Sequence, residues 1–314
     1  MKILVTNLVH LGPLDLPAGV EAVPFDETEP VPARHRDAEA VVIWGKSPDL
    51  PAFFASLPRL RWIQALAAGP DTLLAANPPG DILITVGVHF HDATVAEHAL
   101  ALLLTTVRHM PTFLDRQREH VWASDLGGIQ PWHTQGRLSS LWGTRTAVWG
   151  FGAIGQEIAR HLVPFGTRVT GIAHRAGERA GFPVVADDAL PELLPATDVL
   201  VMVLPRRPDT DNALNAHVID LLPDHAHVVN VGRGSTVDED ALASALREGR
   251  LGAAALDVVK DEPLPPDSPL WDVPNLVITP HAAGGRPVGV EERLAHNVRV
   301  LLGAPGEMIG LVKR

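Results

Sequence analysis

Three segments in the second half of the chain place ionisable side chains just after short apolar runs that are typical of β-strands. The segment VVNVGRGSTVDEDAL carries Arg233, ALDVVKDEPLP carries Asp257 and Glu262, and LVITPHAAGG carries His281. In an open α/β sheet, ligands bind outside the carboxyl ends of the strands, so these side chains are expected at one edge. A guanidinium can bind an anion there, and an imidazole beside a carboxylate can transfer a proton. Each residue alone is more often structural, so a catalytic interpretation depends on their combination.

A glycine-rich loop lies upstream of these segments. The stretch TAVWGFGAIGQEIARHLVPFG has the pattern Gly150-x-Gly152-x-x-Gly155 between a strand-like run and a helical one. The pattern alone is weak, but this context is typical of a dinucleotide-binding turn, and the alternative is a βα turn without a ligand. The first two glycines allow a tight turn and a close approach of the pyrophosphate, and the third allows helix–strand packing. The N–H groups at the helix start, including those of Ala153 and Ile154, would bind the phosphates.

The second strand of this unit ends without the acidic residue that usually binds the adenosine ribose of NAD. The stretch GIAHRAGER has Ala173 at that point, followed by His174 and Arg175, and Arg206 and Arg207 follow the next strand. A carboxylate would repel a 2′-phosphate, whereas basic side chains can bind one through charge-assisted hydrogen bonds. The sequence therefore predicts NADP in preference to NAD. The alternative is that these are solvated loop charges and that NAD is used.

Length and composition restrict the class of protein. At about 150 residues per domain, the 314 residues should form two domains. The net charge of −11 argues against general nucleic-acid binding, which needs a basic face. The chain contains no cysteine, which excludes disulfides, thiolate catalysis and cysteine-ligated metals. Two His-x-His pairs, at 89–91 and 225–227, lack an obvious third ligand, so no metal site is expected.

No membrane segment is expected. The N-terminal stretch MKILVTNLVH predicts a first strand rather than a signal peptide. The longest apolar helical run, about Ala99 to Val107, is far shorter than the roughly 20 residues of a membrane span. A cytoplasmic location is therefore expected.

The elements that must position these residues form two β/α alternations, which indicate parallel sheets. The predicted strands are Lys2–Thr6, Val41–Trp44, Trp62–Ala65 and Ile82–Val86 in the first, and Thr146–Gly150, Arg168–Ile172, Val199–Leu204, Val228–Val231, Ala253–Val258 and Leu276–Thr279 in the second. A helical pattern and a tail follow Arg286.

A helix and a long excursion separate the two alternations. The stretch DATVAEHALALLLTTVRHM begins with Asp92 as a plausible N-cap and is apolar on nearly all faces. It predicts a helix buried between domains or between subunits. Residues 120–143 carry Trp122, Trp132 and Trp142 with little periodicity, and loops of this length are usually functional or packed against something. The helix and the excursion together suggest a homodimer.

Most of the chain resembles the D-isomer-specific 2-hydroxyacid dehydrogenase family. Six segments have the family's order and spacing: ALAAGPDTLL, GVHFHDATVAEHALALLL, the GxGxxG unit, NVGRG, LDVVKDEPLP and SPLWDVPNLVITPH. The segment VVIWGKSP and the basic turn, which is defined here by His174, Arg175, Arg206 and Arg207, are most like the glyoxylate/hydroxypyruvate reductases. The resemblance implies an α/β protein with two Rossmann-like domains, in which a central dinucleotide-binding domain (93–285) is inserted in a flavodoxin-like substrate domain (1–92 and 286–314). The crossings would act as hinges.

The resemblance also implies residue roles. His281 would protonate the substrate carbonyl as hydride arrives from the nicotinamide, and Glu262 would hold its imidazole and favour the protonated form. Arg233 would bind the carboxylate of a 2-keto acid and polarise its carbonyl. Asp257 would accept a hydrogen bond from the nicotinamide carboxamide. The backbone N–H groups near Ala68 and Gly69 would bind the substrate carboxylate. Val231, Gly232 and Ala283 would lie near the carboxamide and the ribose of the cofactor.

The implied function is NAD(P)H-dependent reduction of a small 2-keto acid, such as glyoxylate or hydroxypyruvate or a bulkier acid, to the D-2-hydroxy acid. The alternative is a non-catalytic, dinucleotide-sensing protein similar to the transcriptional corepressors that resemble this family, and turnover would separate the two. Formate dehydrogenase has the same fold but pairs its histidine with Gln, so Glu262 argues against it.

Some segments depart from the family pattern. Leu204-Pro205-Arg206-Arg207-Pro208 stands where the family usually has Leu-Pro-Leu-Thr-Pro, which alters the adenosine pocket. Trp132 is a candidate for the aromatic residue that in related reductases reaches the active site of the partner subunit, although an ordinary packed loop is the simpler interpretation. Glu97 and His98 resemble a family helix start and are expected to be structural.

Overall fold

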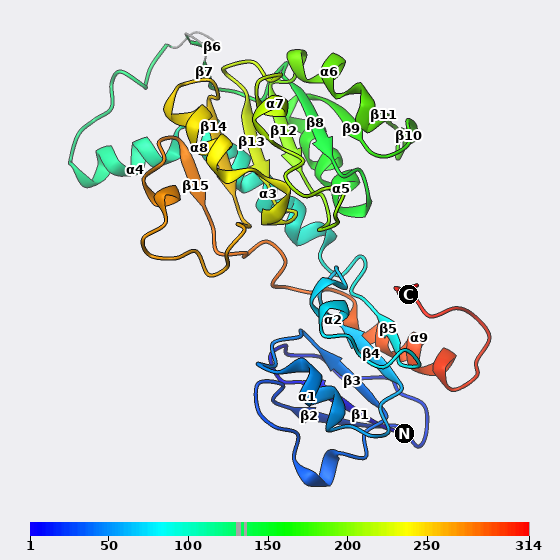
Figure 1. Ribbon diagram of the computed structural model, residues 1–314. Coiled ribbons are helices and arrows are strands. Elements are labelled where there is room, and N and C mark those ends of the chain that lie inside the picture. Colours follow the sequence, from blue (N-terminus) through cyan, green and yellow to red (C-terminus); the bar gives the residue numbers. More distant parts are fainter. Residues whose placement is uncertain (130–132, 135–136, 314) are drawn as a thin grey trace. The chain divides into compact units, whose positions relative to one another are not determined.

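The computed structural model describes residues 1–129, 133–134 and 137–313, so Trp132 lies outside the described residues. The chain forms two compact units, one of Met1–His91 with Gly284–Arg314 and one of Asp92–Ala283. Each unit has its own parallel sheet (Figure 1). In the part of the chain that the structure describes, no helix is both long and apolar enough to cross a membrane.

The sheet of the first unit has five parallel strands in the order β2-β1-β3-β4-β5, which is the flavodoxin-like order. Its strands are β1 Lys2–Thr6, β2 Glu21–Phe25, β3 Ala40–Ile43, β4 Trp62–Ala65 and β5 Leu83–Thr85. The flavodoxin-like fold that the sequence predicts is confirmed, but β2 is missing from the predicted strands. It is an exposed edge strand containing Pro24, which is tolerated there because one side of an edge strand has no ladder to complete.

Helices cover both faces of this sheet. The helices are α1 Leu50–Ala55, α2 Asp71–Ala75 and α9 Val290–Leu301, with the 3-10 turn η1 Ala33–His35. Alternation along β1 sends Ile3 and Val5 to the face that packs with α9, and Leu4 to the face that packs with α1. The C-terminal segment is thus an integral part of the N-terminal unit.

The second unit contains an eight-stranded sheet in the order β10-β11-β9-β8-β12-β13-β14-β15. Its strands are β8 Arg145–Trp149, β9 Arg168–Ile172, β10 Gly177–Arg179, β11 Phe182–Val185, β12 Val199–Met202, β13 His227–Asn230, β14 Ala253–Leu256 and β15 Leu276–Ile278. All pairs are parallel except β10 with β11. From β11 to β14 the parallel strands follow the 3-2-1-4-5-6 order of dinucleotide-binding folds, and β15 adds one more strand, so the predicted Rossmann-like fold is confirmed.

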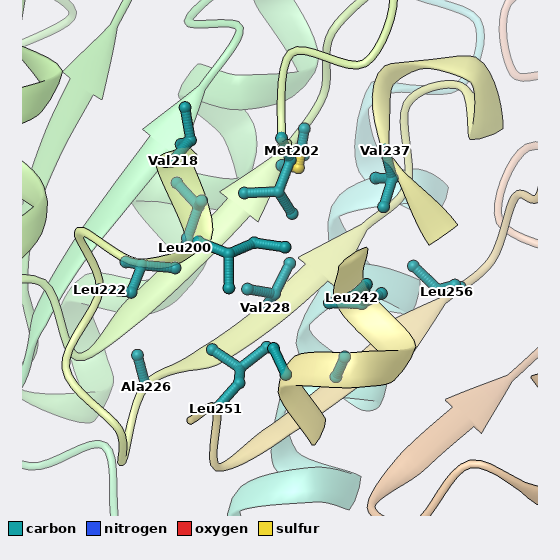
Figure 2. Packing of buried hydrophobic residues seen from close by; sticks show 14 of the residues in the cluster. Leu200, Met202, Val218, Leu222, Ala226, Val228, Val237, Leu242, Leu251 and Leu256 are labelled. Carbon is teal, nitrogen blue, oxygen red and sulfur yellow. The ribbon is translucent and has the colours of Figure 1, made fainter. Parts of the chain in front are cut away.

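The helices of this unit lie on both faces of the sheet. They are α3 Asp92–Val107, α4 Met110–Arg118, α5 Ala153–Leu162, α6 Leu190–Leu193, α7 Ala216–Ile219 and α8 Glu239–Arg247, with 3-10 turns at Val163–Phe165, Asp187–Ala189, Leu194–Ala196, Gly234–Thr236 and Pro269–Asp272 and a small ribbon of β6 His133–Thr134 and β7 Arg137–Leu138. On one face, Leu200 of β12 and Val228 of β13 pack with Leu242 of α8 (Figure 2). On the other, α3 and α5 pack on the same strands.

The apolar helix that the sequence predicts after Asp92 is α3, and part of it is buried within the second unit. Seven of its sixteen residues are buried, and the apolar ones pack with α5 and the central strands of the second unit. The following helix, α4, has no buried residue. The chain beyond it exposes Trp122 by 90 % and Ile129 fully.

Candidate active site

The strand register brings the predicted segments to one edge of the large sheet. Trp149 pairs with Ile172 and Met202, and the same row continues through Asn230, Leu256 and Ile278. The residues directly after this row are the glycine-rich loop, the basic turn, the NVGRG turn, Asp257 and the segment that ends in His281. The sequence places all five at the carboxyl ends of strands, where this fold binds its ligands.

The glycine-rich loop has the shape of a phosphate cradle. Gly150 has φ +100°, and a Cβ on Gly155 would lie 2.4 Å from the carbonyl oxygen of Gly150, so neither position accepts a larger residue. Gly152 is the N-cap of α5, and a Cβ there would point into open space. The loop can therefore receive a pyrophosphate against the N–H groups and the positive dipole end of α5.

A buried amide fixes the turn that carries Arg233. The Oδ1 atom of Asn230 accepts from Gly232 N–H at 3.0 Å, and its Nδ2 donates to the Arg233 carbonyl at 3.0 Å. Thr236 donates to the same carbonyl at 2.7 Å. Arg233 Nη1 in turn donates to the Gly232 carbonyl at 2.8 Å. Sequence reasoning missed Asn230 and Thr236, although an Asn at a strand end before a glycine is a recognisable turn signal.

His281 and Glu262 form a hydrogen-bonded pair. The Nδ1 atom of His281 lies 2.7 Å from Oε2 of Glu262, and the other carboxylate oxygen accepts from Val259 N–H at 3.2 Å. His281 has φ +52°, a left-handed conformation that is uncommon outside glycine and clusters at functional sites. With Nδ1 engaged by the carboxylate, Nε2 is the ring nitrogen left to face a ligand, and half of the side chain is exposed.

Asp257 is buried beneath this histidine segment. Its Oδ1 accepts from the Thr279 hydroxyl at 2.6 Å and from Ala282 N–H at 2.9 Å, and its Oδ2 accepts from Ala283 N–H at 3.1 Å. Nε2 of His98, on α3, lies 3.1 Å from the same Oδ1. The contact to a nicotinamide carboxamide that the resemblance implies for Asp257 stays a prediction, and the carboxylate already organises the chain around His281.

Two carboxylates, which were not predicted from the sequence, lie beside the basic side chains. His174 Nδ1 lies 3.0 Å from Oδ2 of Asp187, and its Nε2 lies 3.9 Å from Oδ2 of Asp209. Arg207 Nε lies 3.1 Å from Oδ1 of Asp209. Arg175 and Arg206 are exposed. These acids reduce the local positive charge that the sequence pattern predicts.

A further arginine joins the basic turn to the glycine-rich loop. Arg179, in β10, donates to the Phe151 carbonyl at 3.4 Å and to the Arg175 carbonyl at 3.0 Å. Its role was not predicted from the sequence, because the β10–β11 hairpin that carries it was not predicted.

In the first unit, Ala68 and Gly69 lie in the loop between β4 and α2. A buried carboxylate holds the neighbouring loop after β3. Glu27 accepts hydrogen bonds from the backbone N–H groups of Trp44 and Lys46, both at 2.8 Å. Burial raises the pKa of Glu27, and these backbone hydrogen bonds act in the opposite direction.

The His225-x-His227 pair has separate partners. His225 Nε2 lies 2.8 Å from Oδ1 of Asp198, whereas Nδ1 of the buried His227 lies 3.0 Å from the Thr106 hydroxyl. Burial, and then repulsion from His109 and His225, lower the pKa of His227 to about 3. Among the described residues no group of three His, Cys, Asp or Glu side chains could hold a metal ion.

The fold and the glycine-rich loop define a Rossmann-type dinucleotide-binding protein with a second α/β unit. The family model for the D-isomer specific 2-hydroxyacid dehydrogenase NAD binding domain matches residues 100–283. The human glyoxylate reductase/hydroxypyruvate reductase is 30% identical over 99% of this chain and 95% of its own length. The chain therefore belongs to the D-isomer specific 2-hydroxyacid dehydrogenase family, whose members are NAD(P)-dependent oxidoreductases.

Solved structures agree with this assignment. A family member from Aeromonas salmonicida superposes with a TM-score of 0.82 at 30% identity, covering 99% of this chain and 98% of that one. An NADPH-dependent glyoxylate/hydroxypyruvate reductase from Sinorhizobium meliloti, in complex with NADP and sulfate, gives 0.78 at 25% identity, covering 99% and 98%. Among the curated relatives, D-3-phosphoglycerate dehydrogenase from Mycobacterium tuberculosis is 29% identical over 87% of this chain, which spans only 50% of that protein.

Proposed function

We propose that this protein is an NADPH-dependent reductase that converts a small 2-keto acid of the glyoxylate or hydroxypyruvate type into the D-2-hydroxy acid. The observation that carries the proposal is the 2.7 Å hydrogen bond between His281 and Glu262, at the same sheet edge as the glycine-rich loop and Arg233. Relatives with the names glyoxylate reductase/hydroxypyruvate reductase support the substrate class.

The proposed dinucleotide site lies within 93–285, and the proposed substrate domain comprises 1–92 and 286–314. The bound nicotinamide would supply the hydride. The residues that would hold the dinucleotide are Gly150, Gly152, Ala153, Ile154 and Gly155 at the pyrophosphate, His174, Arg175 and Arg206 at the adenosine end, and Val231, Gly232, Asp257 and Ala283 at the nicotinamide end.

In this proposal the chain's own groups bind the acid and move one proton. The guanidinium of Arg233 binds the substrate carboxylate and polarises the adjacent carbonyl, and the N–H groups near Ala68 and Gly69 also donate to that carboxylate. Nε2 of His281 donates a proton to the carbonyl oxygen. Glu262 accepts from Nδ1 and keeps the ring in the orientation that directs Nε2 outward.

The preference for NADP rests on the lack of a carboxylate at Ala173 and on the exposed arginines at 175 and 206. A family member from Xanthobacter autotrophicus was solved in complex with NADPH, which supports it. The test is the loss of absorbance at 340 nm with NADPH or NADH and with glyoxylate, hydroxypyruvate or phenylpyruvate.

A kcat/KM ratio of about 10 or more in favour of NADPH, equivalent to roughly 1.4 kcal/mol, is expected. Arg175→Ala should lower that ratio, whereas Arg108→Ala, at an exposed arginine elsewhere in the unit, should not. A preference for NADH would overturn the cofactor assignment. Tight dinucleotide binding without turnover of any 2-keto acid would instead favour a corepressor-like binding protein.

The proposal includes a homodimer and a cytoplasmic location. A second copy of the chain is the expected partner of α4 and the segment after it, because α4 buries none of its own residues and Trp122 is 90 % exposed. Leu114, Val121 and Trp122 are large exposed apolar side chains close together in sequence, which supports an interaction surface at this segment.

A further inference from the structure

The segment that carries His281 is held from below by a buried network that reaches α3. Asp257 is 1 % exposed, and its carboxylate accepts from the side chain of Thr279 and from the N–H groups of Ala282 and Ala283. These three residues flank His281 in the chain. The backbone N–H of His281 also donates to the Asp257 carbonyl at 2.7 Å, so the position of the imidazole depends on how firmly Asp257 is held.

His98 completes this network from a different element. Its Nε2 lies 3.1 Å from Oδ1 of Asp257 and 3.1 Å from the hydroxyl of Thr279. The hydroxyl donates to Asp257, so a ring N–H of His98 can serve both oxygens. His98 lies in the middle of α3, whose buried face packs on α5 and the strands, so it is a rigid support.

The chain connectivity explains why such a support is needed. Ala283 is the last residue of the second unit, and α3 begins at Asp92, the first residue of that unit. The second crossing therefore adjoins Ala283, a residue of the network, and the helix that carries His98 starts at the first crossing. Without this tie, any displacement of the chain at residue 284 would pass directly to His281, only three residues away.

We propose that His98 is a positioning residue for the reaction, which acts through Asp257 and Thr279 to keep the His281 segment fixed next to the crossing at Ala283. The inference rests on the proposed function for its catalytic consequence, but the anchoring itself does not. A buried carboxylate that loses a donor pays a desolvation penalty, so removal of the ring N–H should loosen the whole segment.

The first test is hydrogen–deuterium exchange of the Ala282 and Ala283 amides in the full chain without added dinucleotide. His98→Phe keeps an aromatic ring but removes the donor, His98→Gln restores an N–H at a similar reach, and His217→Phe is a control at an exposed histidine of α7. We expect exchange about tenfold faster in His98→Phe, near-normal exchange in His98→Gln, and no change in the control. Thr279→Val provides a second variant, which removes only a hydroxyl, and it should also speed exchange.

The second test is steady-state reduction of glyoxylate with NADPH. A misplaced acid should lower kcat between about 10- and 100-fold in His98→Phe while KM changes less than about twofold, because binding groups elsewhere are intact. His98→Gln should recover most of kcat.

Two results would overturn the proposal. Unchanged amide exchange in both His98→Phe and Thr279→Val would show that the network does not anchor the segment. A fall in kcat that His98→Gln does not recover, together with raised KM and lowered Tm, would show a general structural role. If the wild-type chain turned over no 2-keto acid, the proposed function would fail, and the exchange experiment would still decide the anchoring.

Discussion

Nδ1 of His174 lies 3.0 Å from Oδ2 of Asp187, and the other oxygen of that carboxylate accepts from the indole N–H of Trp149 at 2.9 Å. Asp187 is therefore hydrogen-bonded to the last residue of β8, the strand that leads into the glycine-rich loop. A histidine that would bind a 2′-phosphate already has an anionic neighbour, so the affinity of this turn for the phosphate is set by a balance of charges.

Asp187→Asn should strengthen binding of the 2′-phosphate. The substitution removes one negative charge but keeps an acceptor for Trp149, so the fold of the turn should survive. We expect the Kd for 2′,5′-ADP to fall by roughly three- to tenfold, which corresponds to about 1 kcal/mol of removed repulsion between partly exposed charges, while the Kd for 5′-AMP stays unchanged. Isothermal titration at low salt measures both, with Asp188→Asn as the matched control. Equal changes for the two nucleotides would contradict a specific effect on the phosphate.

Most of the fold could be predicted from the sequence because both sheets consist of short apolar strands with clear periodicity. β1, β4 and β9 were predicted with the bounds that the structure has. The missed strands include β2 and the β10–β11 hairpin, which are three to five residues long; β2 and β10 are mostly exposed, and Pro24 and Pro183 interrupt the apolar runs of β2 and β11. β2 and β10 are edge strands, which depend on pairing with a neighbour more than on burial, so hydrophobic periodicity gives little signal for them.

The candidate site could be predicted only in outline. Strand ends and motifs located Arg233, Glu262 and His281, because parallel strands bring their carboxyl ends to one edge. The partners of those residues come from positions that are remote in sequence. His98 lies 159 residues before Asp257, the carboxylate that it contacts, and no local pattern can reveal such a pair.

Glu262→Gln should lower kcat strongly and should leave the Tm of the protein nearly unchanged. The amide cannot supply the charge that Glu262 places 2.7 Å from Nδ1 of His281, and its NH₂ group can turn the ring away from its productive orientation. We expect kcat to fall by about 10²- to 10⁴-fold, the usual contribution of general acid catalysis, with Tm nearly unchanged because both side chains are substantially exposed. Steady-state kinetics and thermal unfolding measure these quantities, with Glu29→Gln as a control at an exposed acid. A kcat within twofold of wild type would remove Glu262 from the proposed mechanism.

Trp122→Asp should convert a dimer into a monomer. The indole is 90 % exposed in the single chain, and Val121 beside it and Leu114 on α4 are also exposed. Large aromatic side chains dominate the binding energy of interfaces, so a charge at this position should raise the dimer Kd by about 100-fold or more. Sedimentation velocity at micromolar concentration measures the change. Trp271→Asp, at a half-exposed tryptophan elsewhere in the unit, should leave the oligomeric state unaltered. A wild-type chain that sediments as a monomer would refute the proposed homodimer.

The buried His227 should make the protein sensitive to mild acid. Its pKa is lowered from 6.5 to about 3 in the folded chain, so below pH 6.5 the unfolded chain binds a proton that the folded chain does not. The free energy of unfolding should therefore be independent of this group above pH 6.5 and should fall by about 1.4 kcal/mol per pH unit between 6.5 and 3. At pH 5 the loss from this histidine alone amounts to roughly 2 kcal/mol.

Urea unfolding at pH 7.5 and pH 5.0 tests this prediction. The quantity to compare among variants is the difference in the free energy of unfolding between the two pH values. His227→Gln cannot titrate, so it should lose about 2 kcal/mol less than wild type over this interval, even if the loss of the hydrogen bond to the Thr106 hydroxyl lowers its stability at both pH values. His217→Gln, at an exposed histidine, should behave like wild type. The same pH dependence in His227→Gln and wild type would mean that the acid sensitivity originates elsewhere in the chain.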